Sequence, residues 1–189
     1  LLPFADGDVD AATAAILTNK LLQLAGGAVY DENGKAQIVH DQKLEVLDQL
    51  IEEANGQPVL VFYNYKHEFD RLQARYPQAV HVKEENVVKR WNAKEIPILL
   101  ANPASAGHGL NLQFGGHIAI WYSPTWNLEF FQQANKRLHR RGQAETVLIH
   151  TLMAKGTIDE RIYDIVLRNK EAGQNALLEA VKARIKEVT

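Results

Sequence analysis

Short apolar runs alternate with amphipathic stretches between residues 59 and 151, and this alternation constrains the fold more than any other feature. Each run spans only a few residues and lacks a polar face, as expected for a strand that is buried on both sides. Strands that alternate with helices at such short spacing predict an α/β fold, in which a parallel sheet carries helices on both faces. The expected strands are Val59–Tyr63, Ala79–Val82, Ile96–Leu100, His117–Tyr122 and Thr146–Thr151.

Apolar residues with a helical period, together with turn signals, divide the rest of the chain. A turn cluster at residues 31–35, between two short β-prone runs, predicts a small hairpin within residues 29–39. A single domain over residues 1–189 is expected, with a helix and hairpin excursion in 1–40 and terminal helices in 157–189. The expected helices are Ala11–Ala25, Asp41–Ala54, Lys66–Arg75, Glu85–Trp91, Trp126–Gln143, Ile158–Asn169 and Asn175–Lys186.

Composition and charge narrow the chemistry that is open to this chain. The 189 residues contain no cysteine, which excludes disulfides and thiolate metal sites. The formal net charge is -2, so there is no global basic footprint for nucleic acid, and any such contact must be local. No apolar run is long enough to cross a bilayer and the start lacks the layout of a signal peptide, which predicts an intracellular protein. A start without methionine suggests an excised domain.

The expected helix Trp126–Gln143 has two different faces. Gln133, Arg137 and Arg140 are spaced i, i+4 and i+7, so a glutamine and two arginines would project the same way. A guanidinium is always charged and offers a fork of donors that suits phosphate oxygens. A solvated basic surface is the plain alternative. The opposite face carries an apolar stripe that would pack on a sheet, and it consists of Phe131, Ala134 and Leu138.

The loop at residues 102–113 follows an expected strand and is rich in small residues. Its composition, with Ser105, Gly107 and Gly109, lets backbone N–H groups approach an anion closely. A tight turn without any ligand is the alternative. Ligands of parallel α/β folds lie outside the carboxyl ends of the strands. We therefore expect the binding region at that edge of the sheet, with the two arginines beside this glycine-bearing loop.

Several common sites are excluded or disfavoured by their missing patterns. The chain has no G-x-x-x-x-G-K-[ST] phosphate loop, no H-E-x-x-H, no G-x-S-x-G and no Rossmann fingerprint. His67 and Glu68 lack a second histidine that would complete a metal site, and we interpret them as a surface pair. Trp91 and Trp126 are interpreted as packing residues rather than platforms for base stacking.

The end of the expected arginine helix resembles motif VI of superfamily-two helicases, in the form Q-A-x-x-R-x-x-R-x-G-Q that Swi/Snf-type DNA translocases use. Upstream, residues 107–112 read G-H-G-L-N-L and match the core of motif V in the same translocases. The residues that match motif VI are Gln133, Ala134, Arg137, Arg140, Gly142 and Gln143.

Two residues depart from motif V. Pro103 stands where the family has Ser or Thr, and Ala106 replaces the first of a glycine pair, which would move a phosphate contact to Asn102 or Ser105. A weaker resemblance to motif IV covers residues 59–65, although an apolar strand followed by a polar turn fits many α/β proteins.

The resemblance implies a helicase C-terminal domain: the second RecA-like lobe of an ATP-dependent, DNA-stimulated translocase or helicase. It covers residues 41–164, and Lys43–Leu44 resembles the start of that lobe. ATP and Mg²⁺ would be bound mainly by a first lobe that this chain lacks, so the isolated chain is expected to be inactive as an ATPase. The implied partners are that N-terminal RecA-like lobe and DNA, expected to be double-stranded. The compact spacing of motifs V and VI resembles phage or bacterial members, which implies a cytoplasmic location, or a nuclear one in a eukaryote.

Site roles follow from the same resemblance, residue by residue. Arg137 and Arg140 would be the catalytic residues, as arginine fingers for phosphoryl transfer, and no metal ligand is expected in this chain. The implied nucleotide-binding set is Gly109, Asn111, Gln133, Arg137 and Arg140. The implied DNA-binding set is Asn64, Tyr65, Lys66, Asn102, Ser105 and Gly107.

Two other classes of function stay open. The chain is also compatible with a stand-alone nucleic-acid binding or regulatory module without ATPase activity, which would bind DNA in a salt-sensitive manner. It is compatible as well with an unrelated α/β domain that binds an anionic small molecule at the loop of residues 105–109. Affinity for phosphate ligands without any dependence on DNA would indicate that second class.

Overall fold

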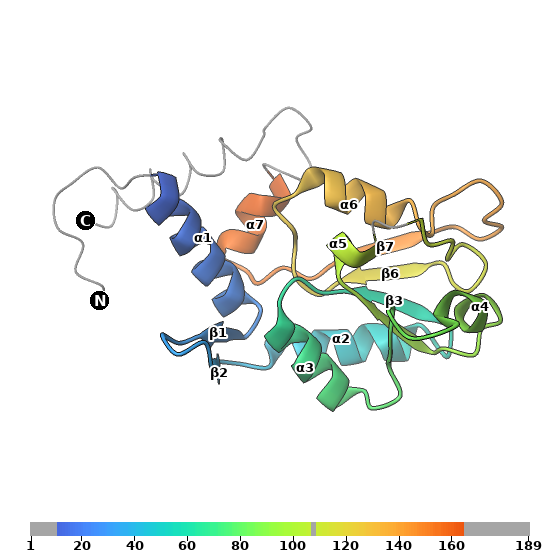
Figure 1. The fold of residues 1–189 in the computed structure, drawn as a ribbon, viewed down its shortest axis with the longest axis horizontal. Coiled ribbons are helices and arrows are strands. Elements are labelled where there is room, and N and C mark those ends of the chain that lie inside the picture. The colour runs from blue at the N-terminus through green and yellow to red at the C-terminus, as the bar shows by residue number, and fades with distance from the viewer. Residues whose placement is uncertain (1–10, 107–108, 165–189) are drawn as a thin grey trace, which may run out of the picture.

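A five-stranded parallel sheet forms the centre of the molecule (Figure 1). The computed structural model describes residues 11–106 and 109–164. The strand order is β4-β5-β3-β6-β7, and every neighbouring pair is parallel, which confirms the predicted α/β fold. The strands are β3 (Val59–Phe62), β4 (Val80–His81), β5 (Ile98–Ala101), β6 (Ile118–Trp121) and β7 (Leu148–Thr151).

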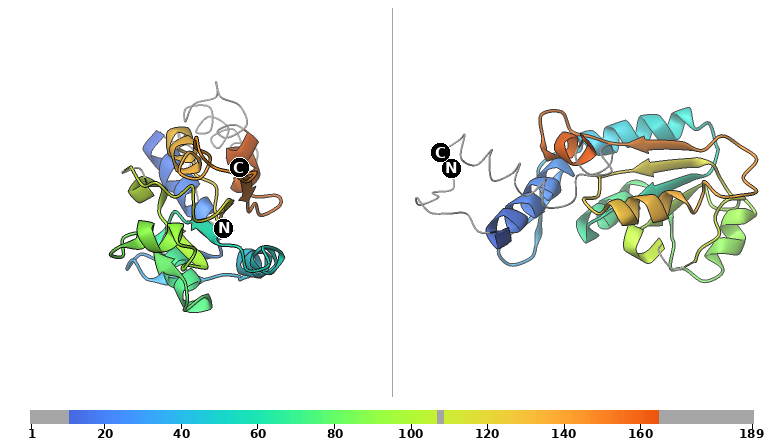
Figure 2. Two further views of the ribbon diagram at one scale, coloured as in Figure 1. Left: turned by 90° about the vertical axis from the view of Figure 1, so that its right-hand side faces the viewer. Right: turned by 90° about the horizontal axis from the view of Figure 1, so that it is seen from above.

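Helices cover both faces of this sheet (Figure 2). Successive residues of a strand point to opposite faces, so Val61 of β3 joins the core under α2 and α3 whereas Phe62 joins the core under α4 and α6. The three central strands are buried along their whole length, which explains their continuous apolar sequences. The helices are α2 (Gln42–Glu53), α3 (Lys66–Arg75), α4 (Val87–Asn92), α5 (Pro103–Ala106) and α6 (Leu128–Asn135).

A helix and a two-stranded antiparallel pair precede the sheet. They are α1 (Ala11–Ala25), β1 (Ala28–Tyr30) and β2 (Ala36–Ile38), and the pair occupies the stretch in which a hairpin was predicted. Arg71 of α3 attaches this unit to the sheet, because its guanidinium donates to the carbonyl oxygen of Gly26 at 2.8 Å and to that of His40 at 2.6 Å.

The last described helix is α7 (Ile158–Ile162), which packs beside α1 (Figure 1). Leu22 of α1 and Ile162 of α7 share a small apolar cluster. The rest of the predicted helix 158–169, and all of the predicted helix 175–186, lie outside the described residues. In the described part of the chain, no helix is both long and apolar enough to cross a membrane.

One prediction about side-chain exposure is wrong. His67 and Glu68 are not a surface pair, because their exposed fractions are 2% and 0%. They stand in the first turn of α3, where Tyr30 of the hairpin and the loop after β6 cover them. Trp91 is fully buried, as predicted for a packing residue. Trp126 is 38% exposed, because it lies in the loop before α6 rather than in a helix packed on the sheet.

The buried His67 determines part of the response of this fold to acid. Its ring lies between those of Tyr30 and Tyr65, at centroid distances of 5.0 and 5.3 Å, and neither ring nitrogen has a hydrogen-bond partner among the described residues. Burial, helped by Arg71 and opposed by Asp70, lowers the pKa of His67 to about 4. Below the ordinary histidine pKa of 6.5, the unfolded chain therefore binds a proton at His67, whereas the folded chain does not. The free energy of unfolding should therefore decrease by on the order of 2 kcal/mol as the pH is lowered from 6.5 to about 4.

We expect the substitution His67→Phe to remove this acid-dependent loss of stability. Phenylalanine keeps a ring between the two tyrosines, cannot be protonated, and forfeits no hydrogen bond. Urea unfolding at about pH 7 and at about pH 4.5 measures the effect as a smaller difference between the two unfolding free energies. The control is His139→Gln at an exposed histidine, which should keep the wild-type difference. An equal difference in His67→Phe and wild type would contradict a neutral buried imidazole.

Candidate functional site

Three loops meet at the carboxyl edge of the sheet, and two asparagine side chains join them. Asn102, directly after β5, donates from Nδ2 to the carbonyl oxygens of Tyr63 and Asn64, at 3.3 and 3.2 Å. Asn64, in the loop after β3, donates from Nδ2 to the carbonyl oxygens of Ser123 and Pro124, both at 3.1 Å. Each amide thus uses both of its hydrogens inside the protein. These two predicted DNA contacts hold the loops after β5, β3 and β6 together.

A buried ionic network lies directly behind these loops. Lys43 Nζ of α2 is 2.6 Å from Asp159 Oδ2 of α7 and donates to Ser123 Oγ at 3.4 Å. Ser123 donates to Glu68 Oε1 at 2.6 Å, and Glu68 Oε2 accepts the backbone N–H of Asn64 at 2.7 Å. Burial raises the pKa of Glu68, against the opposing effect of these hydrogen bonds. The network connects α2, α3 and α7 to the loop after β6.

Sequence reasoning missed the network, although it noticed two of its members, Lys43 and Glu68, for other reasons. Lys43 was singled out only because it resembles the start of the lobe in the family. It stands one helical turn before Leu47 on the buried side of α2, and a charged residue at an apolar helical position is a signal for a buried partner. No local pattern could have named the partners, because Ser123 lies 80 residues further along the chain and Asp159 lies further still.

The predicted helix Trp126–Gln143 is wrong in its second half, because α6 ends at Asn135. Trp121 Nε1 donates to Asn135 Oδ1 at 2.9 Å, which anchors the end of the helix to β6. The backbone N–H groups of Arg137 and Leu138 then bond three residues back instead of four, so the chain tightens and turns. The two arginines and Gln133 consequently do not share one helical face, whereas the predicted apolar stripe does pack on the sheet.

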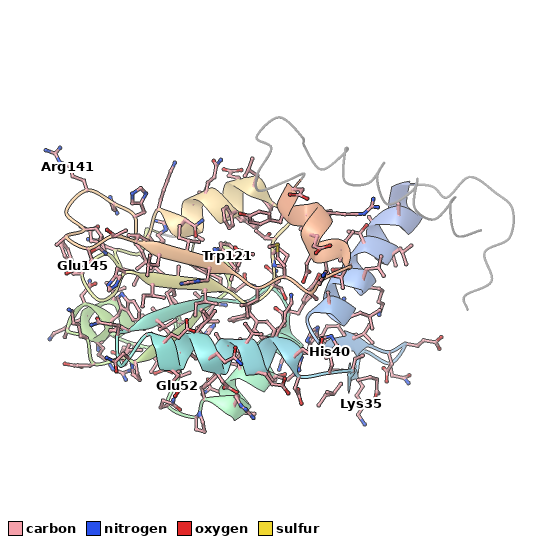
Figure 3. The ribbon with its side chains drawn as sticks, turned by 180° about the vertical axis from the view of Figure 1, so that it is seen from behind. Lys35, His40, Glu52, Trp121, Arg141 and Glu145 are labelled. Atoms are coloured by element: carbon pink, nitrogen blue, oxygen red, sulfur yellow. The ribbon has the colours of Figure 1, made fainter. Side chains whose placement is uncertain are left out.

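We call residues 136–143 the arginine turn. It lies at the amino edge of the sheet, because β6 and β7 are parallel and α6 must carry the chain back before β7 begins. Gln143 Nε2 donates to the carbonyl oxygen of Gly116, just before β6, at 3.1 Å. Figure 3 labels Arg141 at this end, and Arg140 beside it is exposed. The expectation that the arginines lie among the carboxyl-edge loops is therefore wrong.

The glycine-bearing loop starts at the carboxyl edge with α5 and ends near the amino edge. Gly109 is exposed and has a φ of 68°, a left-handed conformation that favours glycine. The carbonyl oxygen of Asn111 accepts a hydrogen bond at 2.9 Å from Asn92, at the end of α4. Gly107 and the side chain of Ser105, both predicted DNA contacts, lie outside the described part of the structure.

The remaining predicted site residues are spread between the two edges. Tyr65 donates its hydroxyl to an asparagine of α1 at 2.7 Å, and burial raises its pKa. Lys66 is exposed and pairs with an aspartate one turn further along α3, at 2.7 Å. Gln133 donates to a glutamate one turn earlier in α6, at 2.8 Å. Arg137 is half-buried at the start of the arginine turn.

Apart from Gly109 and Gln133, the described candidates therefore form two groups at opposite edges of one sheet. Those predicted to contact DNA gather at the carboxyl edge, whereas Asn111, Arg137 and Arg140 gather toward the amino edge. The glycine-bearing loop is one of the segments that lead from the carboxyl edge to the amino edge. Among the described residues, no group of three or more His, Asp or Glu side chains could hold a metal ion.

A parallel sheet with helices on both faces defines an α/β domain, in which two asparagines connect the loops at one edge of the sheet and exposed arginines lie at the other edge. The family model described as the helicase conserved C-terminal domain matches residues 42–142, and the chain belongs to this family. The resemblance to the C-terminal RecA-like lobe of Swi/Snf-type superfamily-two helicases is thereby confirmed.

Relatives occur in phages, bacteria and fungi. The chain is 40% identical over 191 residues to "Putative protein p41" of Acyrthosiphon pisum secondary endosymbiont phage 1, and the match covers 97% of this chain and 41% of that protein. It is 32% identical over 170 residues to the chromatin-remodeling ATPase INO80 of Mycosarcoma maydis, with 80% of this chain and 9% of that protein covered. An uncharacterized ATP-dependent helicase of Mycoplasma genitalium is 30% identical over 154 residues, which is 79% of this chain and 14% of that protein. The chain thus spans less than half the length of these relatives.

A solved structure shares the fold. The crystal structure of the C-terminal part of the Fun30 ATPase domain superposes with a TM-score of 0.62 at 16% identity, covering 95% of this chain and 75% of that one. At this level of identity the likeness concerns the fold alone, and it agrees with a RecA-like arrangement of sheet and helices.

Proposed function

We propose that this chain is a single domain, the second motor lobe of an ATP-dependent translocase or helicase that acts on double-stranded DNA. The observation that carries the proposal is the separation of the candidate residues onto two edges of one sheet. A lobe that converts nucleotide hydrolysis into movement needs one surface toward the nucleotide and another toward the track. The glycine-bearing loop leads from the carboxyl edge to the amino edge and so joins the two.

The amino edge is the proposed nucleotide side. Arg140 is exposed in the arginine turn, and an exposed guanidinium can bind phosphate oxygens that a facing lobe brings to it. Arg137, Gly109, Asn111 and Gln133 would complete this side, in the roles that the motif resemblance implies.

ATP and Mg²⁺ fit this chain only as molecules held mainly elsewhere. The sequence has no G-x-x-x-x-G-K-[ST] loop to hold the phosphates. The described residues offer no group of three carboxylates or histidines for a cation. Arginine fingers act on a phosphoryl group that another surface positions. We therefore propose that the N-terminal RecA-like lobe of the full-length protein supplies the phosphate loop and the metal ligands.

The carboxyl edge is the proposed DNA side, and the residues there have two different roles. The amide donors of Asn64 and Asn102 are engaged with backbone carbonyls, so their role in this proposal is to keep three loops in register. Lys66 is an exposed cation at this edge, and its ammonium has donors left over beyond its aspartate partner. With Tyr65, Ser105 and Gly107 it would contact phosphates of the duplex backbone.

The proposal is tested on the full-length protein that carries this chain, with the isolated chain beside it. ATP hydrolysis is measured without nucleic acid, with single-stranded DNA and with duplex DNA. We expect hydrolysis by the full-length protein to rise most with the duplex, and the isolated chain to hydrolyse no ATP. Absence of any nucleic-acid-stimulated hydrolysis would overturn the motor function. Salt-sensitive DNA binding by a full-length protein that lacks hydrolysis would indicate the binding or regulatory module instead.

A further inference from the structure

Two glutamines connect the arginine turn to the end of the glycine-bearing loop. Gln143 Nε2 donates to the carbonyl oxygens of Gln113 and Gly116, at 2.7 and 3.1 Å. In the opposite direction, Gln113 Nε2 donates to the carbonyl oxygen of Arg141 at 3.1 Å. Each side chain therefore bonds the backbone of the segment that carries the other, and we call this pair the glutamine clasp.

The clasp is closely built. Gln113 is 7% exposed, and a Cβ atom placed on Gly142 would lie only 3.2 Å from Gln113 Nε2. Gly142 has a φ of 100°, a conformation that favours glycine, and the lack of a side chain also lets the Gln113 amide approach closely. Gln143 Oε1 in addition accepts the backbone N–H of Glu145 at 3.0 Å. Both donor hydrogens and the acceptor of Gln143 are thereby engaged with backbone.

The segment that receives the clasp is itself fixed on the sheet. Trp91 Nε1 donates to the carbonyl oxygen of Leu112 at 2.7 Å, and the indole lies so close to Gly115 and Gly116 that a Cβ on either would collide with it. The arginine turn is fixed at its other end by Leu138, which is fully buried. The turn is therefore held at both ends although its middle is not helical.

We propose that Gln113 and Gln143 are positioning residues that hold Arg140 and Arg137 in the geometry needed for phosphoryl transfer. The inference deepens the proposed function and rests on it. Neither glutamine is assigned to the nucleotide, because their amides are spent on backbone carbonyls. The need for them follows from the end of α6 at Asn135. His139 is the last residue of the turn whose backbone N–H bonds four residues back, whereas the N–H of Arg140 bonds the carbonyl oxygen of Leu138, so Arg140 lies beyond the helical hydrogen bonds. Misplacement of a catalytic group by 1 Å costs about 100-fold in rate.

The decisive variants are Gln143→Glu and Gln113→Glu in the full-length protein. Each is close to isosteric, but replaces an amide donor by an oxygen that faces a carbonyl oxygen. We expect kcat to fall about 10- to 100-fold, while KM for ATP changes less than about threefold, because the arginines act on the transition state. The matched control is Gln132→Glu on the exposed side of α6, which makes the same change of charge and should keep wild-type kcat.

A second measurement separates the clasp from a purely structural role. Hydrogen exchange of the isolated chain with Gln143→Ala should show lost protection at the amide of Glu145 and across the arginine turn, with the amides of β6 unchanged. The double variant Gln113→Glu with Gln143→Glu should cost much less in kcat than the product of the single effects, because either change opens the clasp.

The outcomes keep the two proposals apart. A wild-type full-length protein without DNA-stimulated hydrolysis would overturn the proposed function. If the wild type is active and Gln143→Glu retains full kcat, the clasp is overturned while the motor function stands. A fall in kcat shared equally by Gln132→Glu would also overturn it, because the effect would then come from added negative charge.

Discussion

Replacing Arg140 by alanine in the full-length protein is expected to leave ATP binding near normal and to lower turnover by about 10³- to 10⁵-fold, the range found for arginine fingers. The Arg140 side chain is exposed, whereas the turn is packed on the sheet through the buried Leu138. Removing the Arg140 side chain should therefore leave no cavity in the core. In the proposed role, the substitution removes positive charge that acts on the phosphoryl group in the transition state, and such a loss lowers kcat rather than raising KM. Steady-state ATPase kinetics with saturating duplex DNA, together with a nucleotide-binding titration, measure the two quantities separately.

The neighbouring Arg141→Ala is the matched control. Arg141 is exposed in the same turn and carries the same charge, but it falls at the variable position of the motif between Arg140 and Gly142. We expect it to keep turnover within about threefold of wild type, because nonspecific positive charge at an exposed position contributes little. Equal losses in the two variants would show that the turn acts as a general basic surface. Unchanged turnover in Arg140→Ala would refute the assignment of the finger.

The sheet was predictable from the sequence because its signal is local. A strand buried on both faces needs a continuous apolar run, and the three central strands Val59–Phe62, Ile98–Ala101 and Ile118–Trp121 are each buried at every residue. Helix α3 begins and ends where its pattern predicted, and α1 ends at the predicted Ala25, directly before the glycine pair that follows it. For these elements local preference and global packing agree.

The arginine turn shows where local reasoning stops. Its residues continue a helical pattern, and the apolar stripe does pack on the sheet as a helix would require. The end of α6 is set instead by Trp121, a residue of another element whose indole holds Asn135. The placement of the turn at the amino edge was within reach of reasoning, because parallel β6 and β7 require a crossover that returns the chain to that edge.

The buried polar groups were beyond the reach of any local pattern. Lys43, Glu68, Ser123 and Asp159 come from four separate elements or loops, and each looks like an ordinary surface residue by type. Only the fold reveals that they share one interior at the carboxyl edge, directly behind the loops that Asn64 and Asn102 tie together. The loops that carry several of the predicted site residues are therefore supported by a buried network of charged and polar residues that the family motifs do not include.

The buried ion pair between Lys43 and Asp159 leads to the second large prediction, which concerns the stability of the fold. Lys43→Met should destabilise the isolated chain by about 3–5 kcal/mol, because removal of one partner of a buried ion pair leaves the other charge uncompensated. The side chain of Asp159 is 0% exposed, and its Oδ1 atom has no hydrogen-bond partner among the described residues. Besides Lys43, its Oδ2 atom accepts the backbone N–H of Ala154 at 3.0 Å, and no second positive charge is paired with it in the described part of the chain. Urea unfolding monitored by circular dichroism near neutral pH gives the difference in unfolding free energy.

Two controls separate the buried pair from the loss of any lysine. Lys66→Met removes a lysine whose pair with Asp70 is exposed on both sides, and it should change the unfolding free energy far less. Adding Asp159→Leu to Lys43→Met should recover much of the loss, because an apolar pair replaces an orphaned charge.

The pH dependence of Lys43→Met supplies the sharpest check. Burial already raises the pKa of Glu68, and Lys43 is one of the groups that lower it, so the variant should raise this pKa further. A group with a raised folded-state pKa contributes stability at low pH that is lost as the pH rises through that pKa. The destabilisation by Lys43→Met should therefore be smaller at about pH 5 than at about pH 8. A loss of stability that is independent of pH, or one that Asp159→Leu fails to relieve, would show that Lys43 acts through packing alone. The carboxylates behind the loops at the carboxyl edge would then not depend on its charge.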